Sequence, residues 1–297
     1  MKKVYILAIL LLLGQSSWAQ IREFQTTRLM STAGAGVASI LSTEAAILNP
    51  AAAAFFESSS FSYQGYSSAL KKENALRNTT SSKFPKNSRS QGVFMADHSG
   101  PIKGGVGYVT QKENFYDRQR MILHGAAPVG TNSSLGLSYN YVQDRLPSQF
   151  NKQHQANHVL TAGLTNIVDE NTTLGLVVTD ISKALPGEER AIVGVQQKLT
   201  QSLILIADAG TEYRRSASKN YLWRASLQAN FFDDFFVRVG QFHDNITLFK
   251  GTGWGISWIG PRLGVEFAQK YSKQYGQNYI YKDELLVDTS LSAVINL

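Results

Sequence analysis

The sequence predicts an all-β fold, a transmembrane antiparallel β-barrel of about 14 strands with an N-terminal hatch segment in the lumen. From about residue 58 onward, apolar residues recur at every second position in short stretches, which is the period of a strand with one apolar and one polar face. The connections alternate between long polar segments and tight turns, as in outer-membrane barrels. Charged residues make up 17% of a chain rich in glycine and aromatic residues, which favours an all-β protein over a helical one.

Residues 1–19 predict a secretory signal peptide. Two lysines open the segment, an almost unbroken apolar stretch runs from Tyr5 to Leu13, and small residues stand at Ser17 and Ala19, the two positions that a signal peptidase reads. A membrane anchor helix would need about 20 apolar residues, and this stretch is shorter. We therefore expect export and cleavage after Ala19.

Residues 20–57 break the period-two pattern and predict a separate hatch segment. The stretch from Ser31 to Ala38 is rich in small residues, which permit close backbone approach. Thr43 to Leu48 predicts a short helical turn, and Asn49-Pro50-Ala51 predicts a turn that stops it. A segment with so little side-chain bulk can pack inside a barrel.

Residues 58–297 predict the barrel itself. In Ser134 to Tyr141, leucine and tyrosine alternate with serine, glycine and asparagine, and Tyr221 to Phe231 repeats the pattern. About fourteen such stretches are present, and an even number suits a closed barrel whose last strand returns beside its first. They lie at 58–66, 90–97, 102–111, 118–126, 133–143, 156–165, 172–180, 190–198, 202–212, 220–231, 235–242, 252–259, 262–271 and 285–297.

The connections predict which end of the barrel faces outward. The tight turns are expected on the periplasmic side and the longer loops outside. The long connections are predicted at 67–89, 112–117, 144–155, 181–189, 213–219, 243–251 and 272–284. In hydrocarbon every backbone polar group must be paired, and a closed barrel achieves this without an open edge. Aromatic residues are then candidates for girdles at the two membrane interfaces: Trp223, Trp254, Trp258, Tyr108, Tyr139, Tyr141 and Tyr271.

Charged residues on the polar faces of the strands are candidate site residues. These are Arg120, Arg224, Arg238 and Arg262, with Asp208 and Glu266. An arginine facing lipid near the midplane costs about 2–4 kcal/mol, so we expect these side chains to point inward. They form either an internal ion-pair network that joins wall and hatch, or a site for an anionic ligand headgroup such as a fatty-acid carboxylate.

Several other classes of site are not expected. Gly34-Ala35-Gly36 lacks the preceding strand and third glycine of a dinucleotide site. The histidines have no supporting carboxylate pattern for metal binding; they are His98, His124, His154, His158 and His243. No cysteine is present, so thiolate chemistry is excluded. We expect no enzyme activity, cofactor or nucleic-acid partner.

The hatch resembles that of the FadL long-chain fatty-acid transporter family and its PorV-type relatives. Those proteins carry Gly-x-Gly followed by Asn-Pro-Ala and then a fourteen-stranded barrel, and the matching residues here are Gly34, Gly36, Asn49, Pro50 and Ala51. This chain has Ala52 where the family often has glycine, and its loops are short for a FadL transporter.

The resemblance also implies a lateral opening, because the third strand of the family is kinked. Gly104, Gly105 and Gly107 lie in the third predicted strand here, and clustered glycines permit a bend. The alternative is that they leave room for hatch side chains against the wall.

The resemblance implies a channel for passive uptake of small hydrophobic or amphipathic, fatty-acid-like molecules across the outer membrane of a diderm bacterium. The alternatives are a PorV-like scaffold that binds protein partners of an envelope secretion or assembly complex, and a plain structural barrel. Outer-membrane lipids are expected partners in each case. The first long loop carries Lys71, Lys72, Arg77, Lys83, Lys86 and Arg89 against Glu73, and we expect it either to contact lipopolysaccharide phosphates or to be an ordinary solvated loop.

Overall fold

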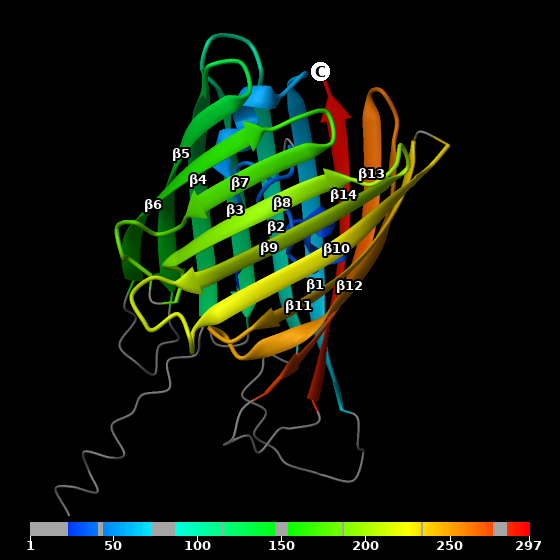
Figure 1. The fold of residues 1–297 in the computed structure, drawn as a ribbon. Coiled ribbons are helices and arrows are strands. Elements are labelled where there is room, and N and C mark those ends of the chain that lie inside the picture. The colour runs from blue at the N-terminus through cyan, green and yellow to red at the C-terminus, as the bar shows by residue number, and fades with distance from the viewer. Residues whose placement is uncertain are drawn as a thin grey trace, which may run out of the picture.

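A computed structural model describes residues 23–40, 44–72, 87–113, 116–145, 154–185, 187–232, 234–275 and 284–297. Its strands form one closed antiparallel barrel in which β14 returns to β1 (Figure 1). The predicted fold class is therefore confirmed. The predicted signal peptide and its cleavage site lie outside the described residues, as do residues 73–86 of the first long loop.

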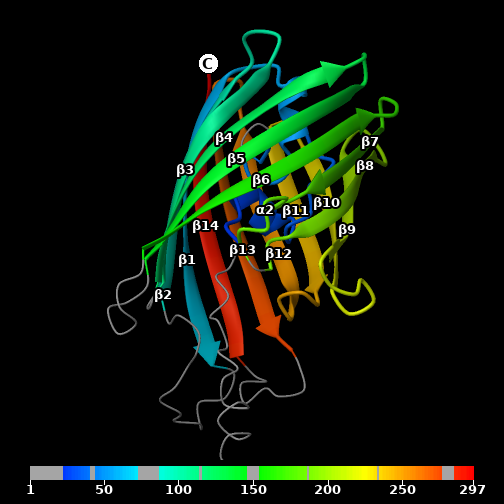
Figure 2. The same cartoon turned by 90° about the vertical axis from the view of Figure 1, so that its left-hand side faces the viewer.

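Fourteen strands build the wall. They are β1 (Ser60–Lys72), β2 (Asn87–Asp97), β3 (Lys103–Glu113), β4 (Tyr116–Val129), β5 (Ser133–Arg145), β6 (His154–Ile167), β7 (Thr172–Val178), β8 (Arg190–Lys198), β9 (Leu203–Glu212), β10 (Tyr221–Phe231), β11 (Phe235–Asp244), β12 (Phe249–Ile259), β13 (Leu263–Gln274) and β14 (Glu284–Asn296). Each predicted stretch overlaps one of them. Figure 2 shows the long strands β4–β6 beside the shorter strands β7–β9.

Two predicted long loops are wrong. The connection expected over 243–251 is a turn of residues 245–248, because Asp244 pairs with Phe249 at the ends of β11 and β12. The connection expected over 112–117 is two residues long, because Lys112 pairs with Asp117 and the β3–β4 ladder continues to Glu113 and Tyr116. These strand ends are polar on both faces, so the period-two signal that marks a strand is absent there. The strands extend beyond the part of the sequence that alternates.

The two faces of the wall differ as the sequence predicts. On β5, Leu135 and Leu137 are 54% and 68% exposed on the outside, whereas Ser134 and Ser138 are buried on the inside. An apolar outer face and a polar interior are the pattern of a barrel that lies in lipid. Trp223, Trp254 and Trp258 also face outward.

No helix in the described part of the chain is long and apolar enough to cross a membrane.

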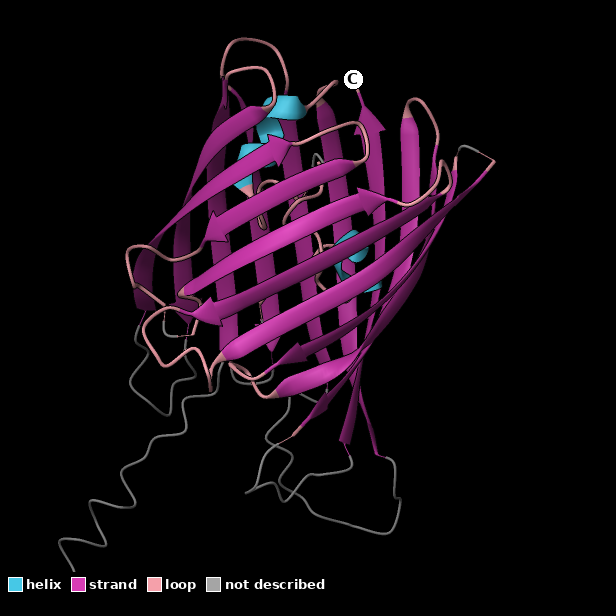
Figure 3. Ribbon diagram, in the orientation of Figure 1, coloured by secondary structure: helices cyan, strands magenta, loops and turns pink. Residues whose placement is uncertain are grey.

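The N-terminal segment lies inside the barrel, where its two short helices appear in cyan in Figure 3. Helix α2 (Thr27–Ser31) begins at Thr26, whose hydroxyl accepts a hydrogen bond from the Leu29 N–H. The 3-10 helix η1 (Pro50–Phe55) begins at Asn49. The predicted turn before Asn49 is present at 44–48, where the Glu44 carbonyl accepts from the Ile47 and Leu48 N–H groups, and it ends there. That Asn49-Pro50 also begins a second helix was not predicted.

The reason is local geometry. Asn49 has an extended backbone, its side-chain oxygen accepts a hydrogen bond from the Ala51 N–H at 3.1 Å, and proline occupies the first helical position. Asparagine as N-cap followed by proline is a favourable start of a helix.

Candidate functional site

The Asn-Pro-Ala motif is anchored to the wall through Asn49. Its side-chain NH2 group donates to the carbonyl of Val37 at 2.8 Å, the carbonyl of Leu164 at 3.2 Å and the hydroxyl of Thr165 at 3.1 Å. Asn49 is 1% exposed, so these bonds have little competition from water. This side chain joins two parts of the hatch to β6.

The Gly-x-Gly motif is anchored by a carboxylate. Asp208 of β9 accepts a hydrogen bond from the Gly36 N–H at 2.8 Å and from the Val37 N–H at 3.2 Å. Arg224, the cross-strand partner of Asp208, donates to the Gly34 carbonyl at 2.9 Å. Gly34 has φ of +92°, a backbone conformation that glycine adopts without strain.

Glycines in the wall make room for the hatch backbone. A Cβ atom on Gly163 would lie 2.0 Å from Asn49 Oδ1, and one on Gly136 would lie 2.3 Å from the Ala51 nitrogen. A Cβ atom on any of six wall glycines would come within 2.6 Å of a hatch atom: Gly136, Gly163, Gly175, Gly240, Gly253 and Gly255. The wall from β5 to β12 is therefore shaped to hold the hatch in one place.

A buried ion-pair group lies beside α2. Arg28 of the hatch donates twice to Glu266 of β13, at 2.7 and 3.0 Å. Arg238 lies 3.6 Å from the same carboxylate and also bonds to Gln228 and Ser257. Buried charges need such partners, and here they join the hatch to the wall.

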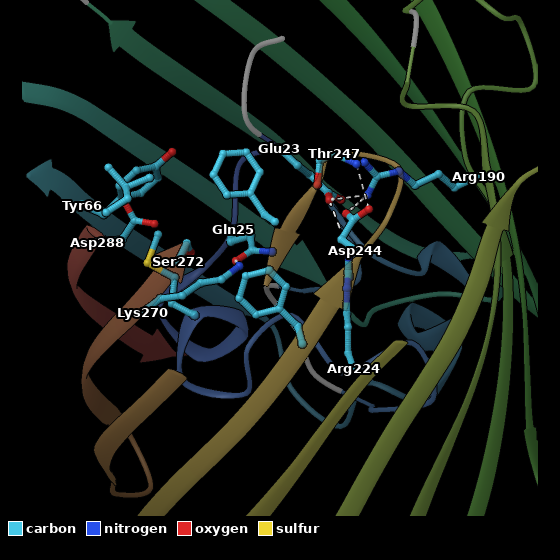
Figure 4. Close-up of a pocket in the computed structure, with 14 residues that line it drawn as sticks. Glu23, Gln25, Tyr66, Arg190, Arg224, Asp244, Thr247, Lys270, Ser272 and Asp288 are labelled. Atoms are coloured by element: carbon cyan, nitrogen blue, oxygen red, sulfur yellow. Dashed lines mark hydrogen bonds and ion pairs between the residues drawn. The ribbon is translucent and has the colours of Figure 1, made fainter. Parts of the chain in front are cut away.

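A cavity lies in the lumen next to the first described part of the hatch (Figure 4). It has a volume of about 90 Å³. Its lining is amphipathic and comprises Glu23, Gln25, Met30, Tyr66, Arg190, Arg224, Phe242, Asp244, Thr247, Phe249, Lys270, Ser272, Leu286 and Asp288.

One side of the cavity carries a group of paired charges. Arg190 lies 3.3 Å from Glu23 and 3.6 Å from Asp244, and Arg224 lies 3.5 Å from Glu23. Asp244 also accepts from the backbone N–H groups of Ile246 and Thr247. These carboxylates already balance the two guanidinium groups.

The opposite side of the cavity combines aromatic rings with one lysine. Lys270 donates to Gln25 at 2.8 Å, and its Nζ lies 4.1 Å from the centre of the Phe242 ring. Behind Gln25, Phe24 packs against Tyr66 and Phe94 with ring centroids 5.7 and 6.2 Å apart. Three cations and three carboxylates line the cavity in total, so its net charge is near zero.

A connection folds inward beside the shortest strand. We name residues 179–185 and 187–189, between β7 and β8, the side loop. Leu185 is 5% exposed and packs on the inward-facing Val142 and Val159, and Glu188 pairs with Arg118 at 2.7 Å and Arg120 at 2.9 Å. Burial works to raise the pKa of Glu188, but the two arginines outweigh it and hold that pKa below its usual value.

The side loop covers an edge of β6. The β6–β7 ladder ends at Ala162 and Val178. Beyond that point, Leu160 accepts from the Ile181 N–H at 2.8 Å and donates to the Ser182 hydroxyl at 3.2 Å. A side chain and a loop thus replace a strand along this part of the wall.

The four predicted headgroup arginines lie in four different settings. Arg224 lines the cavity, Arg120 pairs with the side loop, and Arg238 is buried beside α2. Arg262 is exposed in the turn between β12 and β13. Its predicted place on an inward strand face is wrong, because β13 begins one residue later and the turn directs the side chain to the surface.

The predicted opening at Gly104, Gly105 and Gly107 is also not present. β3 pairs without interruption with β2 and with β4 through these residues. A Cβ on Gly107 would lie 2.7 Å from the Phe94 ring, and one on Gly105 would lie 2.0 Å from the Met95 carbonyl oxygen. Gly107 leaves room for a side chain of the neighbouring wall strand, and Gly105 for its backbone.

Sequence reasoning missed Arg118, Arg190 and Lys270. Arg118 and Lys270 share the polar faces of Arg120 and Glu266 respectively at period two, so the signal was present. Arg190 begins a strand, where the alternation gives no direction for the first side chain. Among the described residues, no group of three or more His, Cys, Asp or Glu side chains is placed to hold a metal ion.

Three solved structures share this fold at low sequence identity. The Ralstonia pickettii toluene transporter TbuX aligns with a TM-score of 0.71 and 12% identity over 93% of this chain and 99% of that chain. The CymD monoaromatic hydrocarbon channel gives 0.69 and 11% over 92% and 97%, and a Pseudomonas aeruginosa FadL homologue gives 0.62 and 12% over 92% and 98%. Neither a family sequence model nor a curated protein matches the chain. The predicted resemblance to the FadL type is thus confirmed for the fold.

Proposed function

We propose that this protein is an outer-membrane channel for small, uncharged hydrophobic molecules, which bind in the lumen cavity beside the hatch. The observation that carries the proposal is the cavity lining, in which Tyr66, Phe242 and Phe249 stand between charges that are already paired. Binding sites for small molecules are largely apolar with a few polar groups that fix orientation. Structures with this fold described as a toluene transporter and a monoaromatic hydrocarbon channel support a compact aromatic ligand.

The paired charges favour an uncharged ligand over a fatty-acid carboxylate. Arg224 and Arg190 already contact Glu23 or Asp244. A carboxylate ligand would have to break one of these pairs and leave a protein carboxylate without its partner in a buried site, which is costly. A neutral ring can instead occupy the apolar part of the cavity and leave the ion pairs in place.

Part of the hatch must move for a ligand to enter. A dry apolar cavity of about 150 Å³ holds benzene in a well-studied protein, and this cavity has about 90 Å³. The side chains of Glu23 and Gln25 are the loosely held part, because Glu23 makes contacts of 3.3 and 3.5 Å and Gln25 one bond to Lys270, whereas Phe24 between them is buried. The parts at Gly36 and Asn49 stay fixed in this proposal.

We place the exit beside β6, under the side loop, rather than at β3. There the wall depends on Leu160, Ser182 and a few loop contacts, whereas the ladders of β3 are continuous. Opening the side loop would break the Glu188 ion pairs and leave the barrel ladder intact. Transport is passive, down the gradient of the hydrophobic molecule.

The test is uptake of radiolabelled toluene and radiolabelled oleate by cells that lack their own hydrophobic channels. With this protein in the outer membrane, toluene uptake rises above that of cells with an empty vector, and oleate uptake does not. Uptake of oleate alone would show a fatty-acid channel and contradict the uncharged ligand. Uptake of neither would contradict the channel.

A scaffold is the second candidate, because the hatch is fixed at many points and the cavity is small. Asn49, Asp208 and Arg28 each take part in a hydrogen bond between the hatch and the wall. A hatch fixed in this way suits a barrel through which no molecule has to pass. Purification in mild detergent distinguishes the two. A scaffold brings stoichiometric protein partners, whereas a channel elutes without them.

A further inference from the structure

A row of outward-facing side chains crosses six neighbouring strands near the long-loop end of the barrel, and we propose that it binds lipopolysaccharide, the phosphorylated glycolipid of the outer leaflet. We call this set of side chains the cationic row. Each of its residues is paired across the sheet with the next one, on the neighbouring strand. Its members are Trp223, His243, Lys250, Lys273, Leu285 and Lys71.

The row lies on the outer surface of the wall. Trp223, Lys250 and Lys71 are exposed, and the residues on either side of His243, Phe242 and Asp244, are buried in the lumen. Because side chains alternate along a strand, His243 and Lys273 share the outer face with their partners. The row is therefore in reach of the membrane and out of reach of the lumen cavity.

The charges of the row are arranged to attract an anion. Lys250 and Lys273 stand directly opposite each other on β12 and β13, and like charges in this position destabilise a sheet. Of the six members of the row, three are lysines and none is acidic.

Aromatic rings flank the lysines on one side. The Tyr275 ring stacks on the His243 ring with centroids 4.8 Å apart, and its hydroxyl bonds to His243 Nε2 at 2.9 Å. Lys250 Nζ lies 5.8 Å from the centre of the Tyr275 ring, and the Trp223 ring stacks on His243 at 6.2 Å. Tyrosine and tryptophan prefer the level where acyl chains meet headgroups, so the lysines stand at headgroup level.

The surface below the row suits acyl chains. On β12, Trp254, Ile256 and Trp258 follow Lys250 on the outer face and are 38%, 52% and 39% exposed. At about 3.3 Å per residue, Trp254 lies roughly 13 Å from Lys250 along the strand. Leu291 continues this apolar surface on β14.

These dimensions fit a headgroup with more than one phosphate. Neighbouring strands are about 4.8 Å apart, so Lys250 and Lys71, three strands from one another, span roughly 14 Å. Lysine binds phosphate as a compact charge on a flexible stem. A zwitterionic phospholipid gains less, because its own ammonium group is repelled by the row.

The test is native mass spectrometry of the full protein in mild detergent, titrated with diphosphoryl lipid A, monophosphoryl lipid A or phosphatidylethanolamine. The wild type should bind the diphosphoryl form most tightly. The double variant Lys250→Gln, Lys273→Gln should lose about tenfold in affinity for it, since charge-assisted contacts are the strong ones. The matched control is Lys198→Gln, Arg262→Gln, which removes the same charge at the short-turn end and should retain wild-type affinity.

Two results would overturn the proposal. One is equal affinity of the wild type and the Lys250/Lys273 double variant for diphosphoryl lipid A; the other is affinity that does not depend on the number of phosphates. Heat-dependent migration in gels checks that each variant forms a closed barrel. If the double variant does not fold, Lys71→Gln alone tests the same row from β1 and should weaken binding about threefold; unchanged binding there would also contradict the site.

Discussion

The carboxylate of Asp208 accepts a hydrogen bond from the backbone N–H of Gly36 at 2.8 Å. This bond links the middle of the hatch to β9. Arg224, the cross-strand partner of Asp208 on β10, donates a hydrogen bond to the Gly34 carbonyl. A glycine motif thus meets a wall carboxylate and a wall guanidinium at the same place. The small residues of the hatch are needed because the backbone itself is the group that binds.

Asp208→Ala should loosen the hatch without opening the barrel. It leaves the N–H groups of Gly36 and Val37 buried and without an acceptor, which costs about 1–3 kcal/mol for each group. Hydrogen–deuterium exchange should rise at residues 34–37 and remain unchanged in β9. Asp169→Ala, in an exposed turn, is the control. Unchanged exchange at Gly36 in the Asp208 variant would contradict its anchoring role.

Gly163→Ala should displace the hatch at its second anchor. The added Cβ would lie 2.0 Å from Asn49 Oδ1, so Asn49 must move and lose its bonds to β6. We expect single-channel conductance in a planar bilayer to rise. Gly264→Ala is the matched control, because its Cβ would meet the nearest atom at 3.6 Å. Equal conductance of the two variants would show that the wall glycines do not position the hatch.

Acid should release the side loop. The pKa of Glu188 lies below its ordinary value of 4.5 because Arg120 and Arg118 outweigh the effect of burial. The ion pair therefore stabilises the closed loop above pH 4.5 and is lost as the pH falls through the lowered pKa. Exchange or spin-label mobility at residues 179–185 should increase only in that acidic range. In the Glu188→Gln variant the side loop should be mobile at neutral pH and its mobility should not change with acid. If the wild-type side loop has the same mobility at all pH values, the Glu188 ion pairs do not hold it closed.

A disulfide across the side-loop edge should block the proposed exit. Leu160→Cys with Ser182→Cys joins β6 to the side loop, where Leu160 N–H bonds to the Ser182 hydroxyl at 3.2 Å. Oxidation should lower toluene uptake and reduction should restore it. Ala162→Cys with Val178→Cys joins direct partners in the closed ladder, and oxidation there should change nothing. If the two pairs behave alike, the molecule leaves by another route.

The strands could be predicted because lipid imposes one rule on every one of them. Leu135 and Leu137 must face hydrocarbon and Ser134 need not, so the alternation survives in the sequence. Where strands leave the membrane, as at Lys112 and Asp117, this rule ends and the prediction of a loop was wrong.

The contacts inside the barrel could not be predicted in the same way. Asp208 and Gly36 are 172 positions apart. The period-two pattern predicts that Asp208 faces the lumen, but it does not predict which residue Asp208 contacts there. The side loop was predicted only as a polar connection, because Leu185 and Glu188 show no pattern that places them inside. The sequence identified candidate charged residues for the lumen. The structure shows that most of them bind the hatch or the side loop.

The most direct test of passage through the lumen cavity compares two substitutions on β14. Leu286→Trp places a large ring in the lumen cavity, whereas Leu291→Trp places the same ring on the outer face, where Leu291 is 58% exposed. Uptake of radiolabelled toluene should fall about tenfold or more with Leu286→Trp, because the added ring occupies the space that the ligand needs. It should stay at the wild-type rate with Leu291→Trp. Wild-type uptake by a folded Leu286→Trp barrel would contradict passage through the cavity.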